Sequence, residues 1–427
     1  MPGKPAPTSP AERSEWLLYP NCGGEEGGDW SRFSHFPGVW NCLRLWRFLF
    51  PAEAVGAIGP VELPDAFWPS EIENAPPDAA FQWIDQQPGA HPWWGDTLAQ
   101  AAFKQAKVPW TGPDPHQARH VHDKAFALET GRQLGFEANC LRGLSETFSP
   151  EALEDPDPFF RTVQSRIRNW PGWLDAFTLK PRLGSSGRGR IAGARSELNR
   201  DALCRGLPRM KQRGGAILEP WLSRRHDLSV ALHLSSEGSG RPSAVTLLGS
   251  LESIMHPSGL PMGHFGEMDS RGRVFSGSPF DEDIREAAVA LAQAAQDAGY
   301  TGPCGVDAFT FSRPEAGQAR ETLRPIVEFN ARYTLGLLAV GVLRRLLEWI
   351  KATLDLTPGE RIAFFVGLQP PEGLESWTAY PGPPSSKIVG VALSPSEANS
   401  AASGPGVLLS RDRVALAALI GAPSSPD

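Results

Sequence analysis

The pentad Glu328-Phe329-Asn330-Ala331-Arg332 follows an apolar run, Leu323-Arg324-Pro325-Ile326-Val327, and the two stretches together are typical of a β-strand. Side chains at positions i, i+2 and i+4 of an extended strand share one face. The pentad therefore places the carboxylate of Glu328, the carboxamide of Asn330 and the guanidinium of Arg332 in a row, about 6–7 Å apart at each step. Carboxylate and amide oxygens suit Mg²⁺, and a guanidinium suits a phosphate or a developing oxyanion.

A second carboxylate lies 21 residues upstream, in the strand-like run Gly305-Val306-Asp307-Ala308-Phe309. Asp307 thus adds a hard ligand from another strand. Two strands that carry metal ligands, with an arginine beside them, predict chemistry on a magnesium-bound nucleotide.

The composition narrows the class of protein. The chain has 427 residues, enough for two or three domains with a sizeable core. Its 41% hydrophobic and 21% charged residues are typical of a soluble globular protein. The formal net charge of −7 argues against a nucleic-acid-binding surface, which is normally basic.

The cysteines and the apolar runs indicate the cellular compartment of the protein. No Cys-x-x-Cys pair occurs, so neither a zinc site nor a disulfide framework is predicted from Cys22, Cys42, Cys140, Cys204 and Cys304. Residues 1–13 lack an apolar signal-peptide core, and no run approaches the ~18–20 apolar residues that span a bilayer. We expect a cytoplasmic protein with reduced thiols and no membrane partner.

Four regions are expected along the chain: a disordered leader (1–14), an N-terminal α/β domain (15–115), an α+β domain (116–355) and a Pro/Ser/Gly-rich C-terminal segment with short strands (356–427). Helices are predicted over residues 116–135, 197–205, 281–298 and 335–354, the last one amphipathic. A connector is predicted over residues 148–160. Strands outside the two already described are predicted over residues 15–19, 177–181, 216–222, 227–234, 244–251, 387–393 and 406–409.

The order of the chemistry-bearing residues resembles the ATP-grasp superfamily. That order is Lys124, Lys180, the loop Gly184-Ser185-Ser186-Gly187-Arg188-Gly189, Glu219, Asp307, Glu328 and Asn330. The resemblance covers approximately residues 115–350, and the N-terminal part only by position. It implies an α+β fold in which two α+β subdomains enclose ATP, preceded by an α/β domain that helps to bind the acceptor.

The resemblance implies that Lys124 and Lys180 are the two nucleotide-binding lysines, whose charges would offset those of the phosphates. The glycine-rich loop that follows Lys180 would close over the phosphates, because glycine lets backbone N–H groups approach anionic oxygens. Further donors in this loop are Ser185, Ser186 and Arg188. The loop is not a Walker loop, since no Gly-Lys-Ser/Thr follows it, and its place after the lysine differs from that of a protein kinase.

Glu219 matches the hinge strand that borders the adenine in the superfamily. Pro220 has no N–H, so the backbone donor to the adenine would be Trp221 or Leu222. Asp227 is the candidate for the ribose hydroxyls, because a carboxylate accepts hydroxyl protons; the alternative is a helix- or turn-capping aspartate.

The resemblance assigns Asp307, Glu328 and Asn330 as Mg²⁺ ligands, with Mn²⁺ as a possible substitute. The ion would bridge the β- and γ-phosphates. Arg332 matches the arginine near the transferred phosphate or the acyl intermediate, and with Lys180 it would stabilise the charge that develops.

Other conspicuous residues are given structural roles. His116, His120 and His122 lie on one predicted helix without a third zinc ligand, so a solvated helix face is expected. Trp93-Trp94 is expected to pack in the core rather than to line an acceptor pocket. The Gly/Pro-rich loop between His256 and His264 lies where superfamily members often contact the acceptor, and His264 or Arg225 is a candidate for that contact.

The resemblance implies an ATP-dependent carboxylate–amine ligase. It would transfer the γ-phosphoryl group of ATP to a carboxylate, and an amine would attack the acyl phosphate to give an amide, ADP and phosphate. Its partners would be small-molecule carboxylate and amine substrates, including amino acids or peptides; the oligomeric state is left open. The alternative is an ATP-binding phosphotransferase or a non-catalytic nucleotide-binding regulator of the same fold. A dinucleotide-binding oxidoreductase is disfavoured, because no acidic residue follows the glycine-rich loop in a βαβ context.

Overall fold

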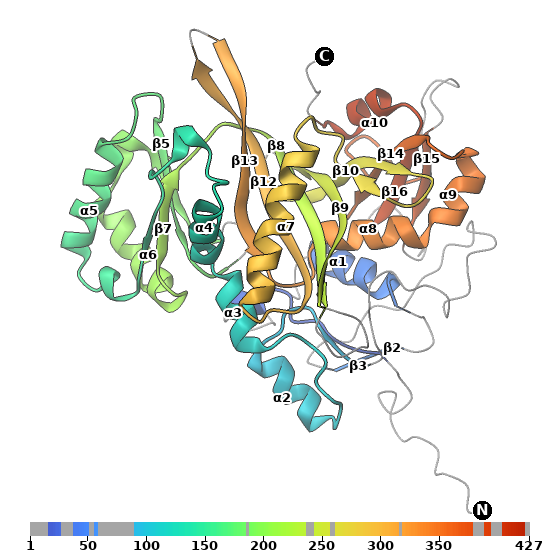
Figure 1. Cartoon of the computed structure of the whole chain (residues 1–427), viewed down its shortest axis with the longest axis horizontal. Coiled ribbons are helices and arrows are strands. Elements are labelled where there is room, and N and C mark those ends of the chain that lie inside the picture. Colours follow the sequence, from blue (N-terminus) through green and yellow to red (C-terminus); the bar gives the residue numbers. More distant parts are fainter. Residues whose placement is uncertain are drawn as a thin grey trace, which may run out of the picture.

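The computed structural model describes residues 16–26, 37–50, 55–58, 89–184, 188–235, 243–256, 261–315, 318–378, 388–393 and 404–422. Three β-sheets organise this part of the chain (Figure 1). The predicted disordered leader lies outside the described residues, and so do Ser185, Ser186 and Gly187 of the predicted phosphate loop.

The N-terminal sheet is parallel, so the carboxyl ends of its strands meet at one edge. Its strands lie in the order β2-β1-β3 and comprise β1 (Trp16–Tyr19), β2 (Val55–Ala57) and β3 (Gly89–Pro92). The helical segments of this region are η2 (Gly24–Glu26), α1 (Pro37–Phe48) and α2 (Thr97–Gln105). A parallel sheet with helices between its strands confirms the predicted α/β character of this region.

The small subdomain, on the left of Figure 1, is a four-stranded antiparallel sheet with helices packed on it. Its strand order is β4-β7-β5-β6, with β4 (Glu146–Phe148), β5 (Ala176–Pro181), β6 (Ile191–Ala194) and β7 (Ala216–Pro220). Its helices are η5 (Asn139–Leu141), η6 (Glu151–Leu153), α5 (Pro156–Arg168), η7 (Arg195–Glu197) and α6 (Arg200–Gln212). The predicted connector at 148–160 is wrong at its end, because Asp155 caps α5 and Pro156 begins it.

The large sheet has nine strands in the order β13-β12-β8-β9-β11-β10-β14-β16-β15. They are β8 (Arg224–Ser235), β9 (Ala244–Met255), β10 (Pro261–Asp269), β11 (Val274–Phe275), β12 (Gly302–Glu315), β13 (Gln318–Asn330), β14 (Arg361–Gly367), β15 (Ile388–Ala392) and β16 (Gly406–Ser410). Its helices are α7 (Asp281–Asp297), α8 (Leu335–Arg345), α9 (Leu347–Leu354) and α10 (Arg413–Ile420). The predicted α+β class, with two α+β subdomains after an α/β region, is therefore confirmed.

The helix predicted over residues 116–135 is wrong as a single element. It forms α3 (Pro115–His122) and α4 (Lys124–Gln133), which are separated by Asp123 in an extended conformation. The Asp123 carboxylate accepts the Ala125 N–H at 2.9 Å and pairs with Arg182 at 2.7 Å. This break places Lys124 at the first position of α4, facing the small subdomain.

The helix predicted over residues 335–354 is also two elements, α8 and α9, which meet at Leu346. The prediction that it is amphipathic is wrong for α8, where every residue from Gly336 to Leu343 is buried. The large sheet packs on one side of α8 and α1 packs on another, so no face is left for solvent.

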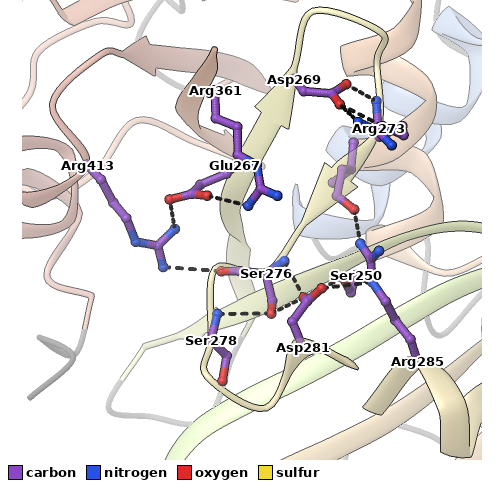
Figure 2. A network of polar contacts seen from close by, with 11 residues as sticks. Ser250, Glu267, Asp269, Arg273, Ser276, Ser278, Asp281, Arg285, Arg361 and Arg413 are labelled. Atoms are coloured by element: carbon purple, nitrogen blue, oxygen red, sulfur yellow. Dashed lines mark hydrogen bonds and ion pairs between the residues drawn. The ribbon is translucent and has the colours of Figure 1, made fainter. Parts of the chain in front are cut away.

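A polar network fastens the C-terminal segment to the large sheet (Figure 2). Arg361 of β14 and Arg413 of α10 both reach Glu267 of β10, at 3.3 Å and 3.6 Å. The guanidinium of Arg361 also lies 3.9 Å from the centre of the Phe275 ring. These contacts tie residues far apart in the sequence to one edge of β10.

Asp281, the first residue of α7, is the centre of the same network (Figure 2). Its carboxylate accepts the Ser276 N–H at 2.8 Å and the Ser250 hydroxyl at 2.6 Å, and it pairs with Arg285 at 2.9 Å. A single side chain thus joins β9, the turn after β11 and α7.

We expect Asp281→Ala to lower the free energy of unfolding by about 2–4 kcal/mol, because Arg285 loses its ion-pair partner and three further donors lose their acceptor. Urea denaturation measures the change. The control is Asp283→Ala in the same turn, where the side chain is exposed and a change within about 0.5 kcal/mol is expected. Equal losses in the two variants would contradict the role given to Asp281.

Candidate active site

Asp307 and Glu328 face each other on adjacent strands, β12 and β13, as direct partners in the ladder. Opposite residues of an antiparallel pair project from the same face, and like charges there repel. Burial, and then the charge of Glu328, raises the pKa of Asp307 to about 7. Burial alone would raise the pKa of Glu328 as well, but Lys124 and Lys180 lower it to about 2. The structure thus brings two predicted metal ligands and two predicted phosphate-binding lysines together.

Asn330, the last residue of β13, and Arg332, two residues beyond it, continue the row, as the alternation predicted. The Asn330 amide donates to the Asp307 carboxylate at 3.0 Å, and its Oδ1 accepts from Arg332 Nη2 at 3.4 Å. Arg332 Nε lies 3.2 Å from Glu25 Oε1. Burial opposes the charge on Arg332, but Glu25, Glu328 and Asp307 raise its pKa.

Two half-buried carboxylates that face each other, with an amide beside them, fit a divalent cation. Among the described residues no group of three or more His, Cys, Asp or Glu side chains could hold a metal ion. A cation here would therefore complete its shell with the Asn330 Oδ1 and with oxygens from water or a phosphate. The Asn330 amide must turn over for this, since its nitrogen now faces Asp307.

Lys180, Glu219 and Arg324 form a buried ion triad between the two sheets. The Glu219 carboxylate lies 2.9 Å from both Lys180 Nζ and Arg324 Nη1. Burial would raise the pKa of Glu219, but Arg324 and Lys180 hold it far below its usual range. Burial lowers the pKa of Lys180, against the opposing effect of Glu219. Glu219 is thus the counter-ion of Lys180 in this structure, and its place beside an adenine stays a prediction.

The predicted phosphate loop begins against Lys124. Lys124 Nζ lies 3.2 Å from Glu328 and also donates to the Gly184 carbonyl. Gly184 has φ +134°, in the region that favours glycine. On the far side of the undescribed residues, Arg188 is exposed, and its carbonyl accepts from Arg213 at 3.1 Å.

The backbone after β7 corrects one expectation about the adenine. The Trp221 N–H donates to the Ala176 carbonyl at 3.0 Å, so Trp221 is not the free donor that was predicted. The Leu222 N–H remains as the candidate. The Trp221 ring packs against Arg190, whose guanidinium lies 4.5 Å from the ring centre.

Asp227 lies within β8, so it caps neither a helix nor a turn. Its carboxylate accepts from Arg224 Nη1 at 2.6 Å. A contact with ribose hydroxyls stays a prediction.

The sequence interpretation missed Arg324 and His122. Arg324 belongs to the same alternating series as Glu328, and this spacing was the signal that could have found it. His122 was expected on a solvated face, which is wrong. It is buried under Trp94, with ring centres 4.8 Å apart, and its Nδ1 accepts the Ala331 N–H at 3.3 Å. Burial, then Arg332 and Lys124, lowers its pKa well below the usual range, so the ring is neutral.

The remaining candidates have mostly structural surroundings. His116 and His120 are exposed, as predicted. Trp93 and Trp94 are 4% and 3% exposed, which confirms core packing. His264 is buried, with Nδ1 3.3 Å from the Ser253 hydroxyl, and burial lowers its pKa to about 4.

Two further candidates lie at the surface. His256 is exposed at the end of β9. Arg225 donates to the Ser312 hydroxyl at 2.6 Å. No contact between either residue and a substrate is tested by this structure.

The chain is similar in structure to several known proteins. Biotin carboxylase from Campylobacter jejuni is 13% identical, with a TM-score of 0.49 over 94% of this chain and 88% of that one. N5-carboxyaminoimidazole synthase from Aspergillus clavatus, in complex with ADP and 5-aminoimidazole ribonucleotide, is 14% identical, with a TM-score of 0.46 over 93% of each chain. The biotin carboxylase domain of the Hydrogenobacter thermophilus 2-oxoglutarate carboxylase, in complex with MgADP, ADP and bicarbonate, is 14% identical, with a TM-score of 0.44 over 73% and 67% of the two chains.

No protein-family model matches the chain, and no curated protein matches it. Among the described residues, no helix is both long enough and apolar enough to cross a membrane.

We expect Glu219→Gln to destabilise the fold by about 3 kcal/mol, because Lys180 and Arg324 then stay buried without a counter-ion. The lowered pKa of Glu219 sets the sign of the pH effect: its contribution is complete above the unfolded value of 4.5 and is lost as the pH falls. Urea denaturation between pH 7 and pH 3 should therefore show a steeper loss for the wild type than for the variant. Glu154→Gln is the control, since Glu154 is 66% exposed in its pair with Lys211. Parallel pH curves for Glu219→Gln and the wild type would refute the triad.

Proposed function

We propose that this chain is an ATP-grasp ligase that activates a carboxylate as an acyl phosphate and joins it to an amine. The observation that carries the proposal is the half-buried pair Asp307–Glu328, which face each other on adjacent strands, with Lys124 and Lys180 beside it, at the junction of the two subdomains. Ligands for a cation and cations for a polyphosphate are held together there, and the Glu328 side chain stays 20% exposed to solvent.

Each cation of the site is neutralised by a protein carboxylate: Lys124 by Glu328, Lys180 by Glu219 and Arg332 by Glu25. A triphosphate would compete for the lysines, because it offers more negative charge at the same distance. Once Lys124 turns to a phosphate, the Glu328 carboxylate is released from its ion pair. Asp307, Glu328 and the Asn330 Oδ1 would then hold Mg²⁺, which neutralises charge on the β- and γ-phosphates when bound.

The remaining groups fit the transfer steps. A carboxylate oxygen attacks the γ-phosphorus, the bond to the β-phosphate oxygen breaks, and ADP leaves. An amine nitrogen then attacks the acyl carbon, phosphate departs with the C–O bond electrons, and the amine loses a proton. Lys180 and Arg332 stabilise the negative charge that develops in these steps.

No side-chain nucleophile is needed for this chemistry. Burial raises the pKa of Cys22 and Cys304 well above the usual range and that of Cys42 to about 12. These thiols stay protonated and are poor nucleophiles. Direct transfer from ATP to a bound carboxylate agrees with their inert surroundings.

ADP release in the presence of Mg-ATP and a panel of amino acids and dipeptides tests the proposal. A ligase gives ADP, phosphate and a new amide by mass spectrometry. A phosphotransferase gives ADP and a stable phosphorylated acceptor, and a regulatory protein binds Mg-ATP without turnover. Either of the last two results would replace the ligase assignment.

We expect Glu328→Gln to reduce turnover by about 10²-fold or more while the fold is retained, because a charged metal ligand is lost. Steady-state ADP release measures the effect, and circular dichroism checks the fold. Glu315→Gln at the exposed end of β12 is the matched control and should turn over normally. Near-normal turnover by a folded Glu328→Gln protein would contradict the assignment of Glu328 as a metal ligand.

We expect Lys180→Met to raise the Kd for ATP by about tenfold or more, because a buried cation is removed from the phosphate site. Titration calorimetry measures the change. Lys211→Met, in the same subdomain but paired with exposed Glu154, should bind ATP as the wild type does. Unchanged affinity in Lys180→Met would show that Lys180 is only the partner of Glu219.

A further inference from the structure

The backbone of Arg332 is joined to the N-terminal sheet. A β-bridge pairs Arg332 with Trp94, just beyond β3, and the Tyr333 N–H donates to the Trp93 carbonyl at 3.2 Å. The strand that carries the candidate metal ligands therefore ends on the carboxyl edge of the parallel sheet. A structural change in the N-terminal region would therefore alter the position of Arg332 directly.

The side chain of Arg332 is held from the same edge. Its Nε forms an ion pair with Glu25 Oε1 at 3.2 Å, and the Glu25 side chain is only 2% exposed. The other oxygen of Glu25, Oε2, is buried and has no hydrogen-bond partner among the described residues. A buried, half-satisfied carboxylate costs stability, so folding alone does not account for it.

Close contacts fix the position of the loop that carries Glu25. The Asn21 side chain donates to the Trp94 carbonyl at 2.9 Å and accepts the Trp94 N–H at 3.0 Å. A Cβ on Gly24 would lie 3.0 Å from Asp96 Oδ2 and 3.2 Å from the Trp94 ring, so a larger residue at this position would require these groups to shift. The hydrogen bonds of Asn21 and the close packing of Gly24 thus fix the segment that precedes Glu25.

We propose that Glu25 is a positioning residue that orients Arg332 for the reaction from the N-terminal domain. This inference rests on the function proposed above. A continuous chain of contacts leads from Glu25 to Arg332, from Arg332 to Asn330 and from Asn330 to Asp307, with distances of 3.2, 3.4 and 3.0 Å. After Glu25, the acids with the largest electrostatic effect on the Arg332 guanidinium are Glu328 and Asp307. Glu25 therefore keeps the guanidinium from neutralising the carboxylates that the metal ion needs.

Glu25→Gln is the test, because it removes the charge and keeps the shape. We expect kcat for ADP release to fall about 10- to 100-fold, as for other misplaced catalytic groups, while the KM for ATP changes little. Glu25→Asp should recover part of the loss. Asp96→Asn is the matched control: Asp96 is a half-buried acid on the same edge that caps α2 rather than binding Arg332, and asparagine also caps helices.

A double-mutant cycle shows whether Glu25 acts through Arg332. Added to Arg332→Lys, the Glu25→Gln change should reduce kcat no further. Wild-type kcat in Glu25→Gln, or a loss that simply adds to that of Arg332→Lys, would overturn the proposal.

The Arg332 Nε–H resonance in ¹⁵N NMR, identified by its loss in Arg332→Lys, tests the ion pair without turnover. Its chemical shift should change in Glu25→Gln, because the carboxylate charge 3.2 Å from Nε is removed. An unchanged chemical shift would overturn the inference by itself. A wild-type protein that releases no ADP would instead refute the proposed function.

Discussion

Two carboxylates that face each other across neighbouring strands repel, and the repulsion is strongest where water is excluded. Asp307 and Glu328 stand in this relation on β12 and β13. The arrangement persists because Lys124 supplies a positive charge from α4, at 3.2 Å from Glu328. Three features position the Lys124 ammonium group beside Glu328. They are the break between α3 and α4, the start of the phosphate loop and the placement of the small subdomain against β13.

Further pairs of opposite charges surround Asp307 and Glu328. Glu219 carries a negative charge from the small sheet, and Arg324 meets it from the large sheet. Arg332 meets Glu25 from the N-terminal region. The small sheet and the N-terminal region thus each contribute a carboxylate that pairs with an arginine from the large sheet or its end.

The row of site residues at the end of β13 could be predicted from the sequence, because the period of two in a strand places Glu328, Asn330 and Arg332 on one face regardless of the rest of the fold. That Lys124, Lys180 and Asp307 lie in one place was expected from the resemblance of their order to the ATP-grasp superfamily. Contacts between residues far apart in the chain could not be predicted from the sequence. Whether the Trp221 N–H is free depends on Ala176, 45 residues earlier in the chain, and the helix over 116–135 breaks because Asp123 binds Arg182.

The central claim is that Asp307, Glu328 and Asn330 hold a divalent cation together with a nucleotide. Crystals grown with Mn²⁺ and a non-hydrolysable ATP analogue test it most directly, because manganese gives an anomalous signal. We expect an anomalous peak at coordination distance, about 2.0–2.3 Å, from the carboxylates of Asp307 and Glu328, with Lys124 moved from Glu328 to a phosphate. A bound nucleotide with no peak at this pair, or with Lys124 still on Glu328, would contradict the account.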